Sequence, residues 1–169
     1  MPLILLIFLL LLFENKSPLF FQKRIGKNLK AFTLIKFRTM NDGTKDCPTH
    51  LVDSSRITTI GALLRKTKMD EIPQLWNVLK GEMTIVGPRP CLPSQINLIQ
   101  YRRKLKVHKF LPGITGLAQI KGIDMSNPLL LAKTELKMMQ NFNLKYYLYL
   151  IIKTIMGNGL GDRVNKKDF

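Results

Sequence analysis

The sequence predicts a small α+β domain in which short strands and amphipathic helices follow one apolar N-terminal helix. The chain has 169 residues, enough for one domain with a modest core. Short β-rich runs lie between residues 19 and 40, and helical periodicity appears only after them. Residues 2–13 form an uninterrupted apolar run. These three observations together favour a mixed domain with an apolar helix at its start.

The apolar run "MPLILLIFLLLLF" is too short to cross a bilayer. At about 1.5 Å of rise per residue it makes about 18 Å of helix, whereas the hydrocarbon core is about 30 Å thick. A signal peptide is the alternative, but a basic first segment and a small-residue cleavage site are missing. We therefore expect residues 1–17 to form a membrane anchor helix, either re-entrant or interfacial, with Lys16, Lys23 and Arg24 near the lipid headgroups. The abrupt start leaves open that an earlier part of the anchor is absent.

The composition indicates a negatively charged partner. Lys and Arg number 27 and Asp and Glu 11, which gives a formal charge of +16. Nucleic acid, an anionic membrane surface and phosphorylated substrates all fit this charge, and charge alone does not choose among them. The two cysteines, Cys47 and Cys91, lack metal-binding spacing and are expected to be reduced thiols.

A β-hairpin is expected from about residue 19 to residue 40, followed by a polar, turn-rich loop at residues 41–56. On its second strand, the period of two places Phe32, Leu34, Lys36 and Arg38 on one face. The two cations could clamp an anion or form an exposed basic face, and both interpretations remain open.

A short helix is expected at residues 59–66, and a second one begins near Asp70 and ends at Gly81. In the second helix, apolar residues recur at i, i+3, i+4 and i+7, which predicts a buried face. That face consists of Ile72, Leu75, Trp76 and Leu79. Two adjacent carboxylates, Asp70 and Glu71, stand at the start of the same helix. They either cap the helix or take part in chemistry at an anion-binding helix end.

Two turns rich in Gly and Pro follow. "EMTIVGPRP" reads as a short strand and a stiff turn that fixes Arg89, whose planar guanidinium suits a phosphate. "PGITGLAQIKG" forms the second turn. Between them, residues 94–110 form a basic helical stretch that either lies along a membrane or presents a solvated basic face. His108 in this stretch is an interfacial cation or, alternatively, a catalytic base.

Several segments, in order, resemble the bacterial sugar transferase family, the small monotopic phosphoglycosyl transferases. They are "SPLFFQKRIG", "FTLIKFRTM", "RITTIGALLRKTKMDEIPQLWNVLKGEMTIVGPRP" and "PGITGLAQIKG". The resemblance runs from the first residues to about Ile155. It implies transfer of a phospho-sugar from a UDP-sugar to undecaprenyl phosphate, with release of UMP, at the cytoplasmic face of the inner membrane.

The resemblance also implies roles for individual residues. Asp70 is the nucleophile that attacks the sugar-bearing phosphate, and Glu71 helps to hold the Mg²⁺ that the diphosphate needs. Magnesium typically takes one or two carboxylates together with substrate phosphates. The residues assigned to the substrate phosphates and nucleotide are Lys36, Arg38, Arg65, Pro88, Arg89 and Gln119. Further candidates are Arg56, His108 and Glu135, the last aligned with an acidic residue of the family.

The expected organisation is an anchor at residues 1–17, a catalytic domain at 18–156 and a flexible tail at 157–169. The expected partners are a UDP-sugar, undecaprenyl phosphate, anionic membrane lipids and downstream glycosyltransferases, and not nucleic acid, because aromatic residues are not interleaved with the cations. The sequence departs from the family pattern at Leu117, where Trp is usual, and at residues 121–123. A catalytically defective, membrane-tethered basic scaffold and a module binding anionic lipid or nucleic acid remain the alternatives.

Overall fold

The computed structural model describes residues 2–14, 17–41 and 54–156, and the predicted tail and most of the predicted loop lie outside these ranges. A 3-10 helix, η4 (Met69–Gln74), leads directly into α3. The helices and strands in chain order are α1 (Pro2–Glu14), β1 (Leu19–Ile25), β2 (Ala31–Phe37), α2 (Thr59–Thr67), α3 (Leu75–Leu79), β3 (Thr84–Val86), α4 (Ile96–Lys104), β4 (Gly113–Thr115), α5 (Leu117–Ile120), α6 (Pro128–Gln140) and α7 (Leu144–Ile155). The mixed class predicted from the sequence is confirmed.

Strands β1 and β2 form the predicted hairpin. They pair antiparallel, in a register that runs from Leu19 opposite Phe37 to Ile25 opposite Ala31. Phe32 and Leu34 on β2 are buried and pack with Met83, which follows α3 in the chain. Strand β2 also contacts η4, the segment that carries the two adjacent carboxylates.

The two turns rich in Gly and Pro lie against each other. Strand β3, which precedes the first turn, pairs in parallel with β4, which lies inside the second turn, with Thr84 opposite Gly113 and Val86 opposite Thr115. The Gly87 N–H donates to the Thr115 carbonyl at 2.9 Å. A Cβ atom on Gly113 would lie 2.0 Å from the Gly87 nitrogen, so only glycine permits this approach. The strand at residues 84–86 was predicted, but its partner was not.

The prediction of a buried apolar face after Asp70 is wrong. Leu75, Trp76 and Leu79 are 46%, 55% and 79% exposed, whereas Asn77 is completely buried. The segment begins as the 3-10 helix η4 and becomes α-helical only at Leu75, so an unbroken α-helical period does not apply. Its polar side turns toward the hairpin instead, with Gln74 and Asn77 buried.

Asn77 explains why a polar side chain faces inward. Its Oδ1 accepts a hydrogen bond from the Ile35 N–H at 3.1 Å, and its Nδ2 donates to the Thr33 carbonyl at 2.8 Å. The same Nδ2 donates to Glu82 Oε2 at 2.7 Å. A buried amide is stable only when its donors and acceptors are satisfied, and here the free backbone groups of β2 satisfy them.

Over residues 7–14, helix α1 packs on the domain through one side. Ile7 and Leu11 are buried against Phe37 of β2 and Leu64 of α2. Glu14 adds a polar link, because its Oε1 accepts the Ile60 N–H at 3.0 Å. Among the described residues, none of the helices has the length and apolar character needed to traverse a bilayer. The membrane placement of α1 stays a prediction.

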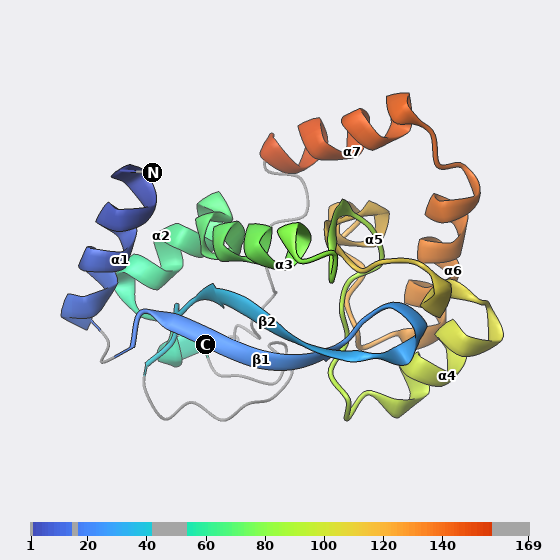
Figure 1. The fold of residues 1–169 in the computed structure, drawn as a ribbon, viewed down its shortest axis with the longest axis horizontal. Helices are drawn as coiled ribbons and strands as arrows, with labels where there is room; N and C mark the ends of the chain where they lie inside the picture. The colour runs from blue at the N-terminus through green and yellow to red at the C-terminus, as the bar shows by residue number, and fades with distance from the viewer. Residues whose placement is uncertain (1, 15–16, 42–53, 157–169) are drawn as a thin grey trace, which may run out of the picture.

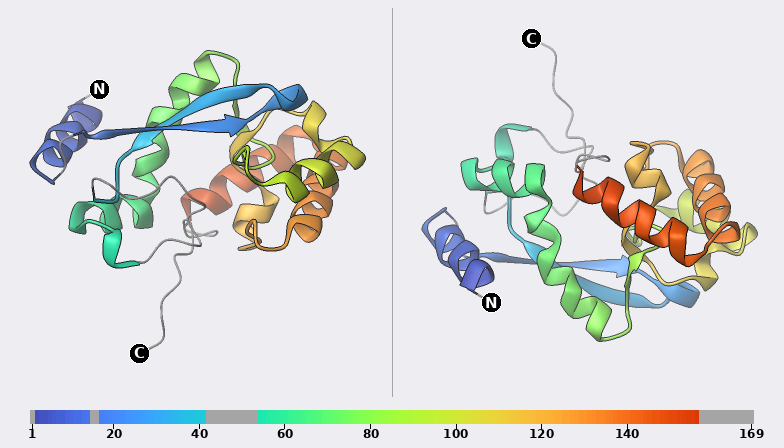
Figure 2. Two further views of the ribbon diagram at one scale, coloured as in Figure 1. Left: turned by 90° about the horizontal axis from the view of Figure 1, so that it is seen from below. Right: turned by 90° about the horizontal axis from the view of Figure 1, so that it is seen from above.

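The hairpin and α7 lie on opposite sides of the molecule. In Figure 1 the hairpin runs below η4 and α3, while α7 runs above them. Figure 2 shows the hairpin in front when the molecule is seen from below and α7 in front when it is seen from above. The segment with the two carboxylates therefore lies between two different surfaces.

Helix α4 has the solvated basic face that the sequence offered as one of two interpretations, but its opposite side is buried. Leu98 and Arg102, one turn apart, are both buried. Leu98 belongs to a core cluster with Cys91 and Leu131, and Ile99 and Leu105 pack against it. Helix α4 thus packs on the core through one side, whereas its other side, which includes Arg103 and Lys104, is exposed.

We predict that Asn77→Ala lowers the free energy of unfolding by about 2–4 kcal/mol, because it leaves two backbone groups of β2 without their partner. Urea unfolding measures the loss. Asn141→Ala is the matched control, since the Asn141 amide bonds only to the exposed Lys137 carbonyl, and it should cost less than about 0.5 kcal/mol. Equal losses for the two variants would contradict the role assigned to Asn77.

Candidate active site

Four of the residues singled out from the sequence meet in one small cavity of about 30 Å³, called here the cleft. Lys36 comes from β2, Asp70 and Glu71 from η4, and Arg89 from the turn after β3. Arg24 of β1 joins them. Residues far apart in the chain thus place three cations around two carboxylates. The cations suit an anionic ligand, and the carboxylates could act as a nucleophile, a base or metal ligands.

The two carboxylates, called here the dyad, occupy the first turn of η4. Asp70 is only 8% exposed, and Glu71 is half-buried. The residue that starts the helix is Lys68, in the left-handed conformation with φ of 57°, and its side chain makes no cap hydrogen bond. The capping interpretation required Asp70 at the N-cap position, but Lys68 occupies that position.

A buried ion pair holds the turn that carries Arg89. Arg102 donates from Nε to Glu135 Oε2 at 2.8 Å and from Nη2 to Glu135 Oε1 at 2.5 Å. Glu135 Oε1 also accepts the Arg89 N–H at 3.1 Å, and Arg102 Nη2 donates to the Arg89 carbonyl at 2.6 Å. The backbone of Arg89 is thus held on both sides, which fixes the direction in which its side chain leaves the turn.

Each charge of this pair depends on the other. Burial raises the pKa of Glu135, and the charge of Arg102 opposes that rise. Burial alone would lower the pKa of Arg102, but the Glu135 carboxylate keeps that pKa above its ordinary value. Glu135, predicted as a further candidate, therefore lies behind the turn as a partner of Arg102, in the interior of the domain.

Sequence reasoning assigned Arg24 to the lipid headgroups, but its side chain is buried and lines the cleft. Its Nη1 donates to the Pro90 carbonyl at 3.0 Å, and its Nε donates to Gln22 Oε1 at 2.8 Å. Gln22 and Arg24 are two residues apart in β1 and therefore lie on the same face. This spacing was the signal in the sequence that could have paired the two side chains.

The other predicted binding residues lie elsewhere. Arg38 donates to the Ser17 carbonyl at 2.9 Å, and Arg65 donates to Thr39 Oγ1 at 2.8 Å. Arg56 is exposed in a short 3-10 turn. Gln119, on α5, has both polar side-chain atoms buried and unpartnered. None of these four residues lines the cleft.

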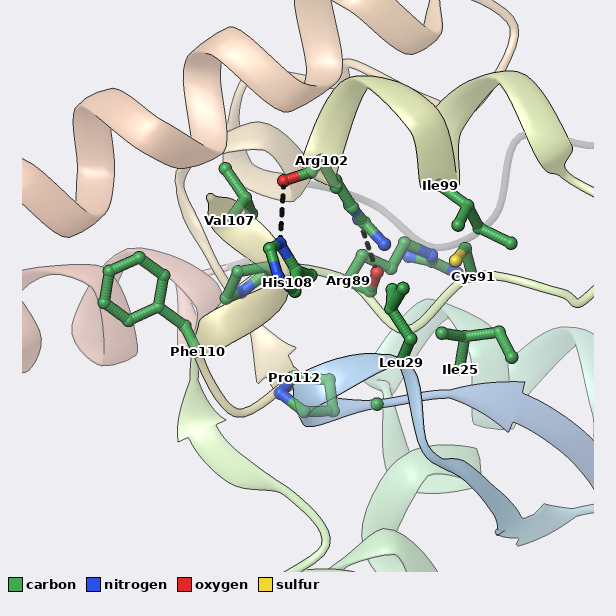
Figure 3. Close-up of a pocket in the computed structure, with 12 residues that line it drawn as sticks. Ile25, Leu29, Arg89, Cys91, Ile99, Arg102, Val107, His108, Phe110 and Pro112 are labelled. Carbon is green, nitrogen blue, oxygen red and sulfur yellow. Dashed lines mark hydrogen bonds between the residues drawn. The ribbon is translucent and has the colours of Figure 1, made fainter. Parts of the chain in front are cut away.

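Pro88 and His108 line a second cavity behind the turn, which Figure 3 shows. His108 Nδ1 lies 3.3 Å from the Arg102 carbonyl oxygen, so the ring rests against the backbone of α4. The cavity has about 20 Å³, room for about one water molecule. Cys91 also lines it, and burial raises the pKa of its thiol, which fits an unreactive, reduced cysteine.

The dyad suits a magnesium ion that shares its ligands with a substrate. Magnesium sites commonly use one or two carboxylates together with phosphate oxygens and water. Asp70 and Glu71 supply two carboxylates in one cleft. In the described ranges, no group of three or more His, Cys, Asp and Glu side chains comes together as a metal site.

We predict that breaking the buried ion pair costs more than removing it. Arg102→Met and Glu135→Met should each lower the free energy of unfolding by about 3–5 kcal/mol, because each leaves an uncompensated buried charge. The double variant should lose less than the sum of the two single losses. Urea unfolding of all three, with Arg103→Met of the exposed neighbour as control, tests this. Strict additivity would refute the coupling.

Comparison with known proteins gives a consistent result. A family model described as bacterial sugar transferase matches residues 1–158. The chain is 49% identical over 107 residues to the uncharacterized sugar transferase EpsL of Bacillus subtilis, covering 63% of this chain and 52% of that protein. It is 34% identical over 172 residues to the exopolysaccharide production protein ExoY of Sinorhizobium fredii, covering 91% and 76%.

A third relative has a more specific name. The UDP-N-acetylgalactosamine-undecaprenyl-phosphate N-acetylgalactosaminephosphotransferase of Aeromonas hydrophila is 30% identical over 164 residues. The alignment covers 91% of this chain but 38% of that protein. The chain thus spans between about a third and three quarters of the length of these relatives. Because the family model extends over nearly all of its residues, the chain belongs to the bacterial sugar transferase family.

Proposed function

We propose that this protein transfers a sugar-1-phosphate from a UDP-sugar to undecaprenyl phosphate and releases UMP. The observation that carries the proposal is the cleft, in which Asp70 and Glu71 lie with Lys36 and Arg89. The name of the Aeromonas hydrophila relative supports the donor and the acceptor, since it contains both UDP-N-acetylgalactosamine and undecaprenyl phosphate. The reaction would be the first membrane step in the assembly of a glycan, such as O-antigen, capsule, exopolysaccharide or glycoprotein.

The cations of the cleft bind the diphosphate. Arg24, Lys36 and Arg89 surround the dyad and offset the repulsion between two carboxylates and a diphosphate. Arg89 suits this role because its backbone is held in place and its planar guanidinium can bind a phosphate through two parallel hydrogen bonds. Lys36 adds a point charge from the hairpin side.

Asp70 is the nucleophile of a two-step reaction. In the first step a carboxylate oxygen of Asp70 forms a bond to the phosphorus that bears the sugar, and the bond from that phosphorus to the UMP oxygen breaks. In the second step an oxygen of the lipid phosphate attacks the same phosphorus, and the bond to Asp70 breaks. Lipid phosphate is already ionised near neutral pH, so the acceptor needs little help from a base.

Mg²⁺ is the expected cofactor, and Glu71 would hold it together with the substrate phosphates. The bound ion would neutralise part of the diphosphate charge. Glu71 fits this role because its half-buried side chain lies beside Asp70 and lines the same cleft.

The protein acts at the cytoplasmic face of the inner membrane. Helix α1 exposes Leu9, Leu10, Leu12 and Phe13 on the side that does not pack on the domain, which supports burial of that side in lipid. The formal charge of +16 favours anionic lipids. Downstream glycosyltransferases of the same pathway would take up the product.

Asp70→Asn should abolish transfer, lowering turnover by more than about a thousandfold, because the amide cannot form the bond to phosphorus. Wild-type protein incubated with UDP-sugar labelled in the sugar and the adjoining phosphate, without acceptor, should retain label after quenching, and Asp70→Asn should retain none. Asp124→Asn is the control, since Asp124 does not line the cleft, and it should label like wild type. Label that survives in Asp70→Asn would show that another residue is the nucleophile.

Removal of magnesium should stop UMP release. Excess EDTA is expected to reduce the rate to background, and added Mg²⁺ should restore it, because the diphosphate charge is otherwise not neutralised in the cleft. Glu71→Gln should need a higher Mg²⁺ concentration for half-maximal rate than wild type. Release of UMP at an unchanged rate in EDTA would remove the metal from the proposal.

A further inference from the structure

A third cavity, called here the groove, lies on the other side of the dyad from the cleft. It has a volume of about 350 Å³, within the usual range for small-molecule sites. Its walls come from the end of α2, from η4 and α3, from β3 and β4, and from α7. Half of the lining residues are apolar, namely Ile72, Leu75, Ile85, Ile114, Ile151 and Ile155. The groove is much larger and more apolar than the cleft.

The few hydroxyl groups of the groove are already used within the protein. Thr67 donates to the Leu63 carbonyl at 3.0 Å, and Thr154 donates to the Leu150 carbonyl at 2.8 Å. Thr115 Oγ1 lies 2.6 Å from Thr154 Oγ1, and since a hydroxyl has one proton, Thr115 is the donor of that bond. A nucleoside needs several hydrogen bonds from its site, whereas a hydrocarbon chain needs none.

One end of the groove reaches the dyad and carries positive charge. Glu71 lines both the groove and the cleft. Lys66 and Lys68 line the groove near this end. The other part opens where Leu75 and Ile155 are 46% and 79% exposed, on the side of the molecule where α7 lies (Figure 1). The groove thus has cations at the end near the dyad and apolar side chains along the rest. A ligand with an anionic head and a long apolar chain matches this arrangement.

We infer that the groove binds the isoprenoid chain of the polyprenyl phosphate acceptor next to its phosphate, with Lys66 and Lys68 attracting that phosphate toward the dyad. The inference rests on the proposed function. In-line displacement requires the lipid phosphate to attack opposite Asp70, at the place that UMP has left. The two substrates therefore share one phosphate position, and their nucleoside and isoprenoid parts diverge, the nucleoside on the cleft side and the chain into the groove.

Kinetics in detergent micelles test this assignment. Leu75→Ser and Ile155→Ser remove apolar surface from the groove at exposed positions that the fold does not depend on. Each should raise the KM for undecaprenyl phosphate about tenfold, because burial of one Leu or Ile side chain is large enough for such a factor. The KM for the UDP-sugar should stay within about twofold of wild type, since the nucleotide does not enter the groove.

Two control variants lie on the same helices. Leu79→Ser on α3 and Ile152→Ser on α7 remove side chains that are 79% and 56% exposed but do not line the groove. Both should keep a wild-type KM for undecaprenyl phosphate. An equal rise in all four variants, or no rise in any, would overturn the inference. Absence of UMP release from wild type with every UDP-sugar and acceptor would instead refute the proposed function.

Photolabelling provides a test that does not need turnover. Wild-type protein is irradiated with a farnesyl phosphate that carries a diazirine on its chain, and the labelled peptides are sequenced. The label is expected on η4 and α3 and on the last turns of α7, and undecaprenyl phosphate should displace it while phosphatidylglycerol should not. Labelling confined to α1, or equal displacement by phosphatidylglycerol, would show that the groove does not select the acceptor.

Discussion

The buried ion pair between Arg102 and Glu135 is the interaction on which the shape of the cleft depends. It joins α4 and α6 directly behind the turn of Arg89 and holds both backbone groups of that residue. A pair of this kind adds little net stability, because the cost of desolvating two charges offsets most of their attraction. Its contribution is positional. Together with the close approach of Gly87 and Gly113, it fixes where the Arg89 side chain can point, and a phosphate bound there meets a preorganised cation.

One short segment separates two kinds of surface. Asp70 and Gln74 of η4 face the polar cleft beside the hairpin, whereas Ile72 and Leu75 face the apolar groove beside α7. Glu71 borders both cavities. The two surfaces differ because the polar side of the segment faces the hairpin. Hydrogen bonds from Asn77 to β2 hold it in this orientation. Because the hairpin satisfies the polar side, the apolar side is left for the groove and the surface. The same cause therefore places the dyad between a water-soluble and a lipid substrate.

Local patterns predicted the local elements, namely the hairpin, the helix at residues 59–66, the short strand at 84–86 and the two stiff turns. They also raised Lys36, Asp70, Glu71 and Arg89 as candidates, and the family resemblance placed them in a larger set with assigned roles. Of that set, these four meet in the cleft. The buried face of the segment after Asp70 was predicted wrongly. Periodicity shows which residues share one face of a helix, but it does not show which face packs on the rest of the domain. The β2 partners of Asn77 and the carboxylate partner of Arg102 lie more than thirty residues away in the chain, so no local pattern could reveal them.

The large positive charge divides into parts with different physical roles. Arg102 is neutralised inside the domain by Glu135, so it contributes to structure and not to attraction of ligands. Arg24, Lys36 and Arg89 face two carboxylates across the cleft, which leaves that site with only a small positive excess. A diphosphate brings more negative charge than this excess can balance. The cations of the cleft are therefore suited to orient a diphosphate but not to neutralise it fully, and a divalent cation held between the dyad and the phosphates would supply the remainder.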